Sequence, residues 1–456
     1  MAASANNNLD FSASVNHRSL LSPLVSVRDA VEEDVFSSLL ALLIQLQTEL
    51  QSADRDAGAL ESATLQLQLT AECFRAQRNS CVHSARNQKL FRDLGFIDES
   101  FKLLSFLLPL RCGIQFLGNL GVGNPSCQDD IWQLSFPGVF LQLLSVDDDK
   151  VMNYTAMVFH TCLDEAKVED LSKPQNIKLA LKVMELCRTH PEVDWTVLIA
   201  TQHFLKSAAL VESMYSQMDH QERVTLLELL QAQLKEEEFE GCGIPPSVAR
   251  FLASSFQTGC GAVLSLATGS GSNDEALTVI SLLDVLCEMT SDHKQFMFLQ
   301  DQPDFLLTTV ELLQQVHAIG KASKNIFSAA QNFSSFSEGS DASPHSPVIS
   351  FKAHLIRLIG NLCHRNTSNQ NKVWIGCNID SNNPFISQWA IFTIRNLLEN
   401  NEQNQELVAS LEQRGPVDYS ALRELGFLVE ERDGSLLLKT CTKKEKEQQT
   451  KILMEM

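Results

Sequence analysis

Two loose groups of cysteine and histidine residues are the part of the sequence whose side chains could bind a metal ion. The groups are Cys363, His364 and Cys377, and Cys73, Cys81 and His83. Zinc sites use thiolate and imidazole ligands at short spacings such as C-x2-C or H-x3-H, which neither group has. Adjacent helical residues also point in different directions. We therefore expect no metal-binding residues and no cofactor.

The sequence also lacks the common motifs of catalytic and nucleotide-binding sites. It has no G-x-S-x-G, no Walker loop and no H-E-x-x-H. The stretch GNLGVGNP contains glycines, but it follows an apolar helical segment rather than a strand, which argues against a dinucleotide fingerprint. We expect no catalytic and no cofactor-binding residues, so the chain is not expected to be an enzyme.

Length and charge narrow the classes of function further. The chain has 456 residues, too many for one ordinary core, which indicates several domains or a repeat array. Its formal net charge is −20, with acid runs at residues 147–149 and 236–238. Such a surface repels phosphate backbones, so we expect no nucleic-acid partner. We interpret the acid runs as solvated surface, and a docking patch for a basic partner is the second interpretation.

The sequence shows no targeting or membrane-spanning segment. The polar N-terminus lacks the apolar core of a secretory signal, and the longest apolar run, Val35–Leu46, is shorter than the roughly 20 residues that cross a bilayer. We expect a cytoplasmic protein without membrane insertion. Its cysteines are then reduced thiols, and several lie in apolar helical patterns where a thiol packs as a small apolar group: Cys73, Cys162, Cys187, Cys287 and Cys363.

An asparagine and a glutamine recur at a fixed spacing in four helical segments. The asparagines are Asn79, Asn119, Asn361 and Asn396. A glutamine follows each of them nine residues later, at Gln88, Gln128, Gln370 and Gln405. In three segments another asparagine directly precedes that glutamine, at Asn87, Asn369 and Asn404. Architecture repeats along a chain whereas an active site usually does not, so we interpret the recurring positions as structural.

The spacing of the copies predicts the fold. Asn79 and Asn119 lie 40 residues apart, and a period of about 40 with all-helical patterning is typical of armadillo and HEAT repeats. A fifth, looser copy has Asp284 in the asparagine place and Asp292-His293 in place of Asn-Gln. We predict an all-α protein, an armadillo/HEAT-like α-solenoid of stacked helical repeats.

The physics of a repeat suggests what its polar residues do. An apolar helical stripe cannot be buried by one repeat alone, so neighbouring repeats bury it together. The asparagine inside each apolar helix is expected to find hydrogen-bond partners on the backbone of an adjacent repeat. A polar turn follows, HRNTSN or ENNEQN, and the asparagine at its end (Asn369 or Asn404) is expected to cap the next helix.

We predict five regions along the chain. They are an N-terminal helical and partly disordered segment (1–60), armadillo-like repeats (61–320), a disordered Ser-rich loop (321–350), a C-terminal helical domain (351–440) and a disordered polar tail (441–456). Within the Ser-rich loop, Ser343 and Ser346 each precede a proline, and both are candidate phosphorylation sites.

Several segments resemble the armadillo-like ataxin-10 family over residues 65–440. The resemblance is strongest in ECFRAQRNSC, RCGIQFLGN, HLIRLIGNLC and NPFISQWAIFTIRNLLENNEQNQ, and the last of these is similar to the family's C-terminal domain. Two stretches, LLSFLLPLRCGIQF and NQNKVWIGCNIDSNNPF, are shorter than the family's pattern. The region 351–440 is therefore expected to be an ataxin-10-type armadillo domain.

The resemblance implies a scaffold that binds other proteins without catalysis. It further implies roles in neuron survival, neurite outgrowth and cytokinesis, with cytoplasmic, perinuclear, centrosome, basal-body and midbody locations. Self-association into a homo-oligomer stays open. Two alternative functions also stay open, namely an importin-like adaptor that binds basic peptides and an enzyme of unrecognised type.

The sequence speaks against the importin-like alternative. Importin-type grooves pair each ladder asparagine with a tryptophan one helical turn earlier, which sandwiches basic side chains. The residues four positions before the signature asparagines are Arg75, Gln115, Arg357 and Phe392. None is a tryptophan, and the four tryptophans share no register: Trp132, Trp195, Trp374 and Trp389. We predict no specific grip on basic import peptides.

Overall fold

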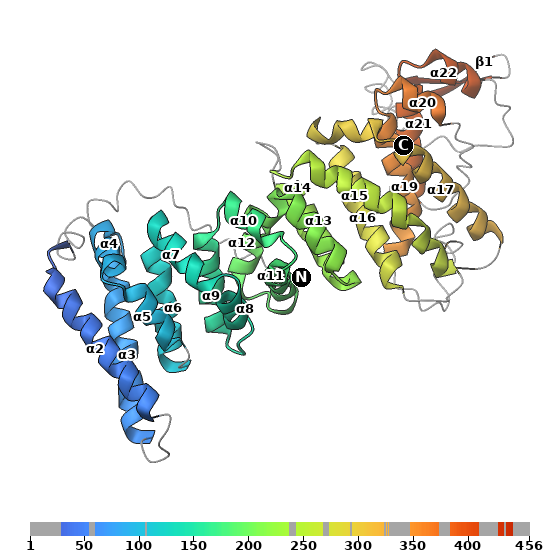
Figure 1. Cartoon of the computed structure of the whole chain (residues 1–456). Helices are drawn as coiled ribbons and strands as arrows, with labels where there is room; N and C mark the ends of the chain where they lie inside the picture. Colours follow the sequence, from blue (N-terminus) through green and yellow to red (C-terminus); the bar gives the residue numbers. More distant parts are fainter. Residues whose placement is uncertain are drawn as a thin grey trace, which may run out of the picture. The chain divides into compact units, whose positions relative to one another are not determined.

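The computed structural model of the chain is built from packed helices (Figure 1). It describes residues 29–53, 60–104, 107–236, 243–267, 273–291, 294–322, 325, 327, 347–373, 384–409, 427–432 and 435–440. The chain divides into two compact units, Met1–Phe204 and Leu205–Met456. This division falls inside the predicted repeat region 61–320, and the boundaries of the five predicted regions stay predictions.

The first unit holds eleven described helices. They are α2 (Glu33–Ala53), α3 (Leu60–Cys81), α4 (Ala85–Asp93), α5 (Phe96–Leu103), α6 (Leu107–Gly121), α7 (Pro125–Ser135), α8 (Gly138–Leu143), α9 (Asp149–Cys162), α10 (Glu165–Leu171), α11 (Ile177–Thr189) and α12 (Asp194–Gln202). The long helices α3, α6, α9 and α12 pack in that order, each against the next, and the shorter helices connect them (Figure 1).

Aromatic rings fill the space between the helices at the start of the first unit. The fully buried ring of Phe91 lies 4.6 Å from Phe36, 4.8 Å from Phe96 and 5.5 Å from Phe116, measured between ring centroids. These four rings come from α4, α2, α5 and α6. Because each buried ring removes a large apolar area from water, the cluster ties neighbouring helices into one core.

The second unit is also helical, with one small sheet. After a short 3-10 turn at Phe204–Lys206 its elements are α13 (Ala208–Gln217), α14 (His220–Glu236), α15 (Pro246–Gly259), η3 (Cys260–Ala267), α16 (Asp274–Ser291), η4 (Lys294–Asp301), α17 (Phe305–Ala322), α19 (Pro347–Cys363), α20 (Thr367–Lys372), α21 (Pro384–Leu398), α22 (Glu402–Ala409), β1 (Phe427–Arg432) and β2 (Ser435–Thr440). Here α14, α16, α19 and α21 pack in sequence, each against the next (Figure 1).

Helices α19 and α21 lie close together at Gly360. A Cβ placed on Gly360 would lie 2.6 Å from Oγ1 and 3.2 Å from Cα of Thr393. Thr393 is buried, and its hydroxyl donates to the carbonyl of Ile356 at 2.8 Å. Glycine at this position therefore sets how near the two helices lie.

The predicted fold class is confirmed, since the described residues form stacked helices with one exception. The exception is an antiparallel hairpin in which Phe427 pairs with Thr440 and Arg432 with Ser435. This hairpin was not predicted from the sequence. Its strands lie inside the predicted C-terminal helical domain, and β2 packs beside α22.

Both ends of the range 321–350, predicted as a Ser-rich loop, are helical. Helix α17 continues to Ala322, and α19 already begins at Pro347, a residue whose fixed φ suits the first turn of a helix. Residues 328–346 lie outside the described residues, as do residues 1–28 and 441–456. No described helix combines the length and apolar character that a bilayer crossing requires.

Candidate functional site

The repeat signature lies on the long helices that form the two rows. Asn79, Asn119, Asn361 and Asn396 are carried by α3, α6, α19 and α21, which we call the ladder helices. The glutamines follow on the short helices α4, α7, α20 and α22. The signature therefore spans one long helix, a turn and one short helix in each copy.

Three of the four signature asparagines donate to the backbone of the preceding long helix. The Nδ2 of Asn119 donates to the carbonyl of Arg78 at 3.1 Å, that of Asn361 to Cys287 at 3.2 Å, and that of Asn396 to Gly360 at 3.0 Å. The side chain of Asn119 thus bonds the residue just before Asn79, and Asn396 bonds the residue just before Asn361. The side-chain amides of these asparagines therefore link each repeat to the one before it.

The first copy differs from the other three. Asn79 is exposed, and its side-chain oxygen accepts from the guanidinium of Arg78 at 3.2 Å. Arg78 also donates to Oε1 of Gln115 at 2.6 Å. The expectation of a backbone partner on an adjacent repeat is therefore not met at Asn79, because this side chain points to solvent.

Two of the four signature glutamines bind the end of the next ladder helix. The Nε2 of Gln88 donates to the carbonyls of Asn119 at 2.9 Å and Val122 at 3.0 Å. In the same way Gln370 donates to Asn396 at 2.8 Å and Glu399 at 3.3 Å. The last carbonyls of a helix have no partner within the helix, so the glutamine supplies one from the neighbouring repeat.

The other two signature glutamines turn back to their own ladder helix. The Nε2 of Gln128 donates to the carbonyl of Gly121 at 2.8 Å, and that of Gln405 to Leu398 at 2.7 Å. Gln405 is exposed whereas Gln370 is buried. Gln405 belongs to the last ladder copy of the sequence, whose helix has no further ladder helix after it among the described residues.

The turn between the ladder helix and the short helix has the same backbone in every copy. Four residues after each signature asparagine the chain takes a positive φ, of 57° at His83, 68° at Gly123, 52° at Arg365 and 54° at Asn400. A left-handed residue at this place is the usual way to end a helix. Only one of the four is glycine, so residue type alone did not reveal the feature.

The N-caps of the short helices differ from those predicted from the sequence. The N-cap residue follows the left-handed residue and is Ser84, Asn124, Asn366 or Asn401. The prediction placed the cap three residues later, at Asn369 and Asn404, and it is wrong. Those asparagines donate their Nδ2 back to the ladder helix, to Leu362 and Leu397, each at 3.0 Å. Both residue types suit a cap, so the distinction depended on the position of the turn.

The loose fifth copy is completed by a residue that the sequence analysis missed. The Nε2 of Gln300, in η4, donates to the carbonyls of Asn361 at 3.0 Å and His364 at 2.9 Å. This is the same pair of positions that Gln88 binds on α6. Asp292 and His293, to which the prediction assigned this place, lie outside the described residues. The 3-10 helix changes the spacing, and the nine-residue rule therefore missed Gln300.

The asparagine place of the fifth copy is also shifted. Asn361 bonds the carbonyl of Cys287, so the residue equivalent to the signature asparagine is Glu288 rather than Asp284. Glu288 pairs with the guanidinium of Arg357 at 3.1 Å. Asp284 instead accepts a hydrogen bond from Nδ1 of His354 at 2.5 Å. Helices α16 and α19 are therefore joined by the Arg357–Glu288 ion pair as well as by the hydrogen bond from Asn361 to Cys287.

The tryptophan face that an importin-like groove would offer is occupied from within the chain. The guanidinium carbon of Arg357 lies 4.9 Å from the centroid of the Trp389 ring, and Phe392 lies 5.8 Å from the same ring. A cation over an aromatic face is the contact that a basic peptide would make. Arg357 therefore competes directly with such a ligand at this place.

The cysteines of the two loose metal groups are packed as apolar residues. Cys73, Cys81 and Cys363 are buried and free. Burial raises the pKa of the Cys363 thiol to about 12, and it raises the pKa of the Cys81 thiol well above its ordinary value. The thiols are therefore protonated at neutral pH, whereas a metal ligand is a thiolate. Cys377 lies outside the described residues, as do Ser343 and Ser346.

The second unit has an open cleft of about 340 Å³ beside α14, α15 and α16. Arg223 stacks 4.7 Å over the Tyr215 ring in its wall and donates to the Tyr215 carbonyl at 2.9 Å. His220 lies 3.3 Å from the hydroxyl of Thr278, but that hydroxyl donates to the Asp274 carbonyl at 3.1 Å. The pair therefore does not place a free nucleophile in the cleft.

The sequence is similar to known proteins over most of its length. The profile of the spinocerebellar ataxia type 10 protein domain matches residues 351–439. Ataxin-10 of Xenopus tropicalis is 40% identical over 440 residues, which cover 91% of this chain and 89% of that protein. Ataxin-10 of Homo sapiens is 38% identical over 443 residues, covering 91% and 90%. An ataxin-10 homolog of Dictyostelium discoideum is 40% identical over 107 residues, which are 21% of this chain.

Proposed function

The chain belongs to the ataxin-10 family, and on this premise we propose that it is a non-catalytic protein-interaction scaffold built on armadillo-like repeats. Its partners are other proteins, and it acts in neuron survival, neurite outgrowth and cytokinesis. Its locations are the cytoplasm, the perinuclear region, the centrosome or basal body and the midbody. The resemblance to the family supports these finer roles.

The observation that carries the scaffold proposal is the internal use of the repeat signature. The amides of Asn119, Asn361 and Asn396 bond neighbouring backbone, and Gln88 and Gln370 bind the ends of neighbouring helices. Because these amide groups already donate hydrogen bonds between repeats, they are not available to bind a substrate. The repeats then act as a frame whose outer side chains bind partners.

The test is capture of partners by the intact purified chain, followed by binding measurements with purified components. A net charge of −20 attracts basic proteins without specificity, so an unrelated folded protein of similar charge and size serves as the control bait. We expect partners that bind this chain and not the control, with micromolar or tighter affinity in calorimetry at physiological salt. If no partner binds as a purified protein while the chain converts a small molecule, the scaffold proposal is wrong and the enzyme alternative gains support.

The importin-like alternative is favoured only by the acidic charge, and a separate experiment tests it. A Lys/Arg-rich import peptide is titrated against the full chain at low and at physiological salt. We expect weak binding that salt removes, because the Debye length is about 8 Å at physiological ionic strength. Tight binding that survives salt and is abolished by Asn361→Ala would contradict this expectation and identify the ladder as a ligand site.

A further inference from the structure

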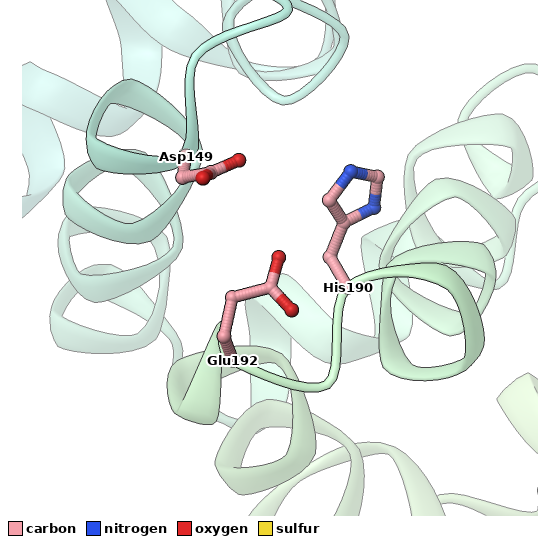
Figure 2. Close-up of side chains that lie close together, drawn as sticks. All are labelled: Asp149, His190 and Glu192. Carbon is pink, nitrogen blue, oxygen red and sulfur yellow. The ribbon is translucent and has the colours of Figure 1, made fainter.

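Three side chains of the first unit converge on one point outside the repeat ladder. Asp149 is the first residue of α9, His190 follows α11, and Glu192 lies in the loop before α12. One ligand atom of each lies within 4.8 Å of those of the other two, and Figure 2 shows the two carboxylates and the imidazole facing the same space. Among the described residues this is the group of three or more that has the composition and spacing of a metal site.

The backbone around the cluster is held in place. The side chain of Asp148 accepts from the amide of Val151 at 2.9 Å and so caps α9 directly beside Asp149. The amide of His190 donates to Leu186 at 2.9 Å, and the amide of Val193 donates to His190 at 3.0 Å. Glu192 is therefore enclosed in a short turn that the His190 and Val193 backbones close. The two elements that carry the three side chains have fixed ends.

The hydrogen bonds of Thr189 decide which nitrogen of His190 is free. The Thr189 hydroxyl donates to the carbonyl of Glu185 at 2.9 Å, so its proton is already used. The same oxygen lies 2.8 Å from Nδ1 of His190 and must therefore accept a proton from it. A neutral imidazole that carries its proton on Nδ1 has a free lone pair on Nε2. This is the tautomer that binds a metal through Nε2, with a partner outside the metal's own ligands that orients the ring.

Within the part of the chain that the structure describes, no ion pair holds either carboxylate of the cluster. Arg111, in α6, pairs with Asp148 and not with Asp149. No ion pair of the described residues involves Asp149, His190 or Glu192. Asp149 and Glu192 are exposed, so their side chains can turn toward a common centre without disturbing packing.

We propose that Asp149, His190 and Glu192 bind one divalent transition-metal ion, of which zinc is the best match. One imidazole with two carboxylates suits zinc, whereas magnesium and calcium prefer oxygen ligands alone. Bonds of about 2.0–2.2 Å in a tetrahedral arrangement hold ligand atoms about 3.4 Å apart, so the side chains need only a modest closure. Water would complete the coordination. The ion links the start of α9 to the α11–α12 loop and so stiffens the first unit, independently of the scaffold role.

The proposal is tested by zinc titration of the full chain in a non-chelating buffer, with calorimetry and melting curves. We expect one saturable site, a higher melting temperature with zinc, and reversal by EDTA. His190→Gln and Glu192→Gln should each weaken binding at least about tenfold, and Thr189→Val should weaken it about tenfold by releasing the ring. Cobalt bound at this site should show no thiolate charge-transfer band, because the ligands are nitrogen and oxygen.

His364→Gln is the matched control. The side chain of His364 is 42% exposed and lies 3.6 Å from the carboxylate of Glu399 in the second unit, but among the described residues no third ligand joins them. We expect this variant to bind zinc like the parent chain. The proposal is overturned if zinc binding does not saturate, if His190→Gln and Glu192→Gln bind as the parent does while melting normally without metal, or if the cobalt spectrum shows thiolate ligands.

Discussion

The interfaces α3–α6 and α16–α19 make the same hydrogen bonds from differently spaced sequences. In the first, Gln88 binds the carbonyls of Asn119 and Val122 from an α-helix. In the second, Gln300 binds those of Asn361 and His364 from a 3-10 helix. The end of each ladder helix leaves carbonyls that need donors, and any element that brings a glutamine there satisfies them. The glutamine makes the same two hydrogen bonds at both interfaces, although an α-helix carries it in one and a 3-10 helix in the other.

In one copy of each unit the residue just before the ladder asparagine is glycine, Gly118 in α6 and Gly360 in α19, whereas the other copies have arginine there, Arg78 and Arg395. A Cβ on Gly118 would lie 2.5 Å from the methyl end of Met157, whereas one on Gly360 would meet Oγ1 and the backbone of Thr393. A flexible side-chain end can move away and a backbone cannot. Equal positions in the repeat therefore differ in how strictly they require glycine.

The largest effect is expected for Gln370→Leu, which removes the most connected glutamine of the ladder. Its amide donates to Cys363, Asn396 and Glu399, and its oxygen accepts from Asn401. Because the site is buried, the free energy of unfolding should fall by about 3–4 kcal/mol. Urea unfolding with hydrogen exchange, which separates the two units, measures it. Gln405→Leu is the control at an exposed site and should change stability by less than about 0.5 kcal/mol; equal losses would show that burial of the glutamine is not what matters.

Gly360→Ala is expected to be the next largest, because it forces α19 and α21 apart. The loss should be about 2–3 kcal/mol, typical of overpacking against rigid atoms. Gly118→Ala should cost less than about 1 kcal/mol because the Met157 side chain can move, and removing glycine from a helix interior offsets part of the cost. The measurement is urea unfolding of both variants. A larger loss of stability for Gly118→Ala than for Gly360→Ala would contradict the expected difference between the two glycines.

Gln88→Ala and Gln300→Ala test whether the two interfaces are equivalent. Each removes two hydrogen bonds to helix-end carbonyls, so each should lower stability by about 1–2 kcal/mol. Exchange of the amides at the end of α6 should increase in the first variant, and that at the end of α19 in the second. Gln302→Ala is the control for Gln300, since among the described residues the Gln302 side chain donates only to the exposed Ser254 hydroxyl, at 3.4 Å. If Gln300→Ala behaves like Gln302→Ala, Gln300 does not play the part of a ladder glutamine.

The smallest expected effect is the difference in the free energy of unfolding between Asn119→Ala and Asn79→Ala. Asn119→Ala removes one bond to the Arg78 carbonyl and should cost about 1 kcal/mol. Asn79→Ala removes only an exposed contact with Arg78 and should stay within about 0.5 kcal/mol. Thermal unfolding of the two variants under one buffer gives the difference. Similar losses at both positions would mean that Asn79 has a structural role that its exposure conceals.

The sequence by itself determined the helical class, the family and the ladder positions. The period near 40 and the fixed Asn-to-Gln interval can be read directly from the sequence, because each repeat has the same order of helix, turn and helix. Buried thiols such as Cys363 were also readable, because an apolar helical stripe shows which face is covered. These features depend on neighbours in the chain.

Tertiary structure decided what the sequence could not. The cap falls on Asn366 rather than Asn369 because a left-handed turn at Arg365 sets where the helix begins. Gln300 joins the ladder only because η4 carries it to the end of α19. Asp149 and His190 are far apart in the sequence and meet only when α9 packs beside the α11–α12 loop. The cap is a local contact that depends on the backbone of the turn, whereas Gln300 with Asn361 and Asp149 with His190 are pairs that local periodicity does not relate, so only the packing of helices brings them together.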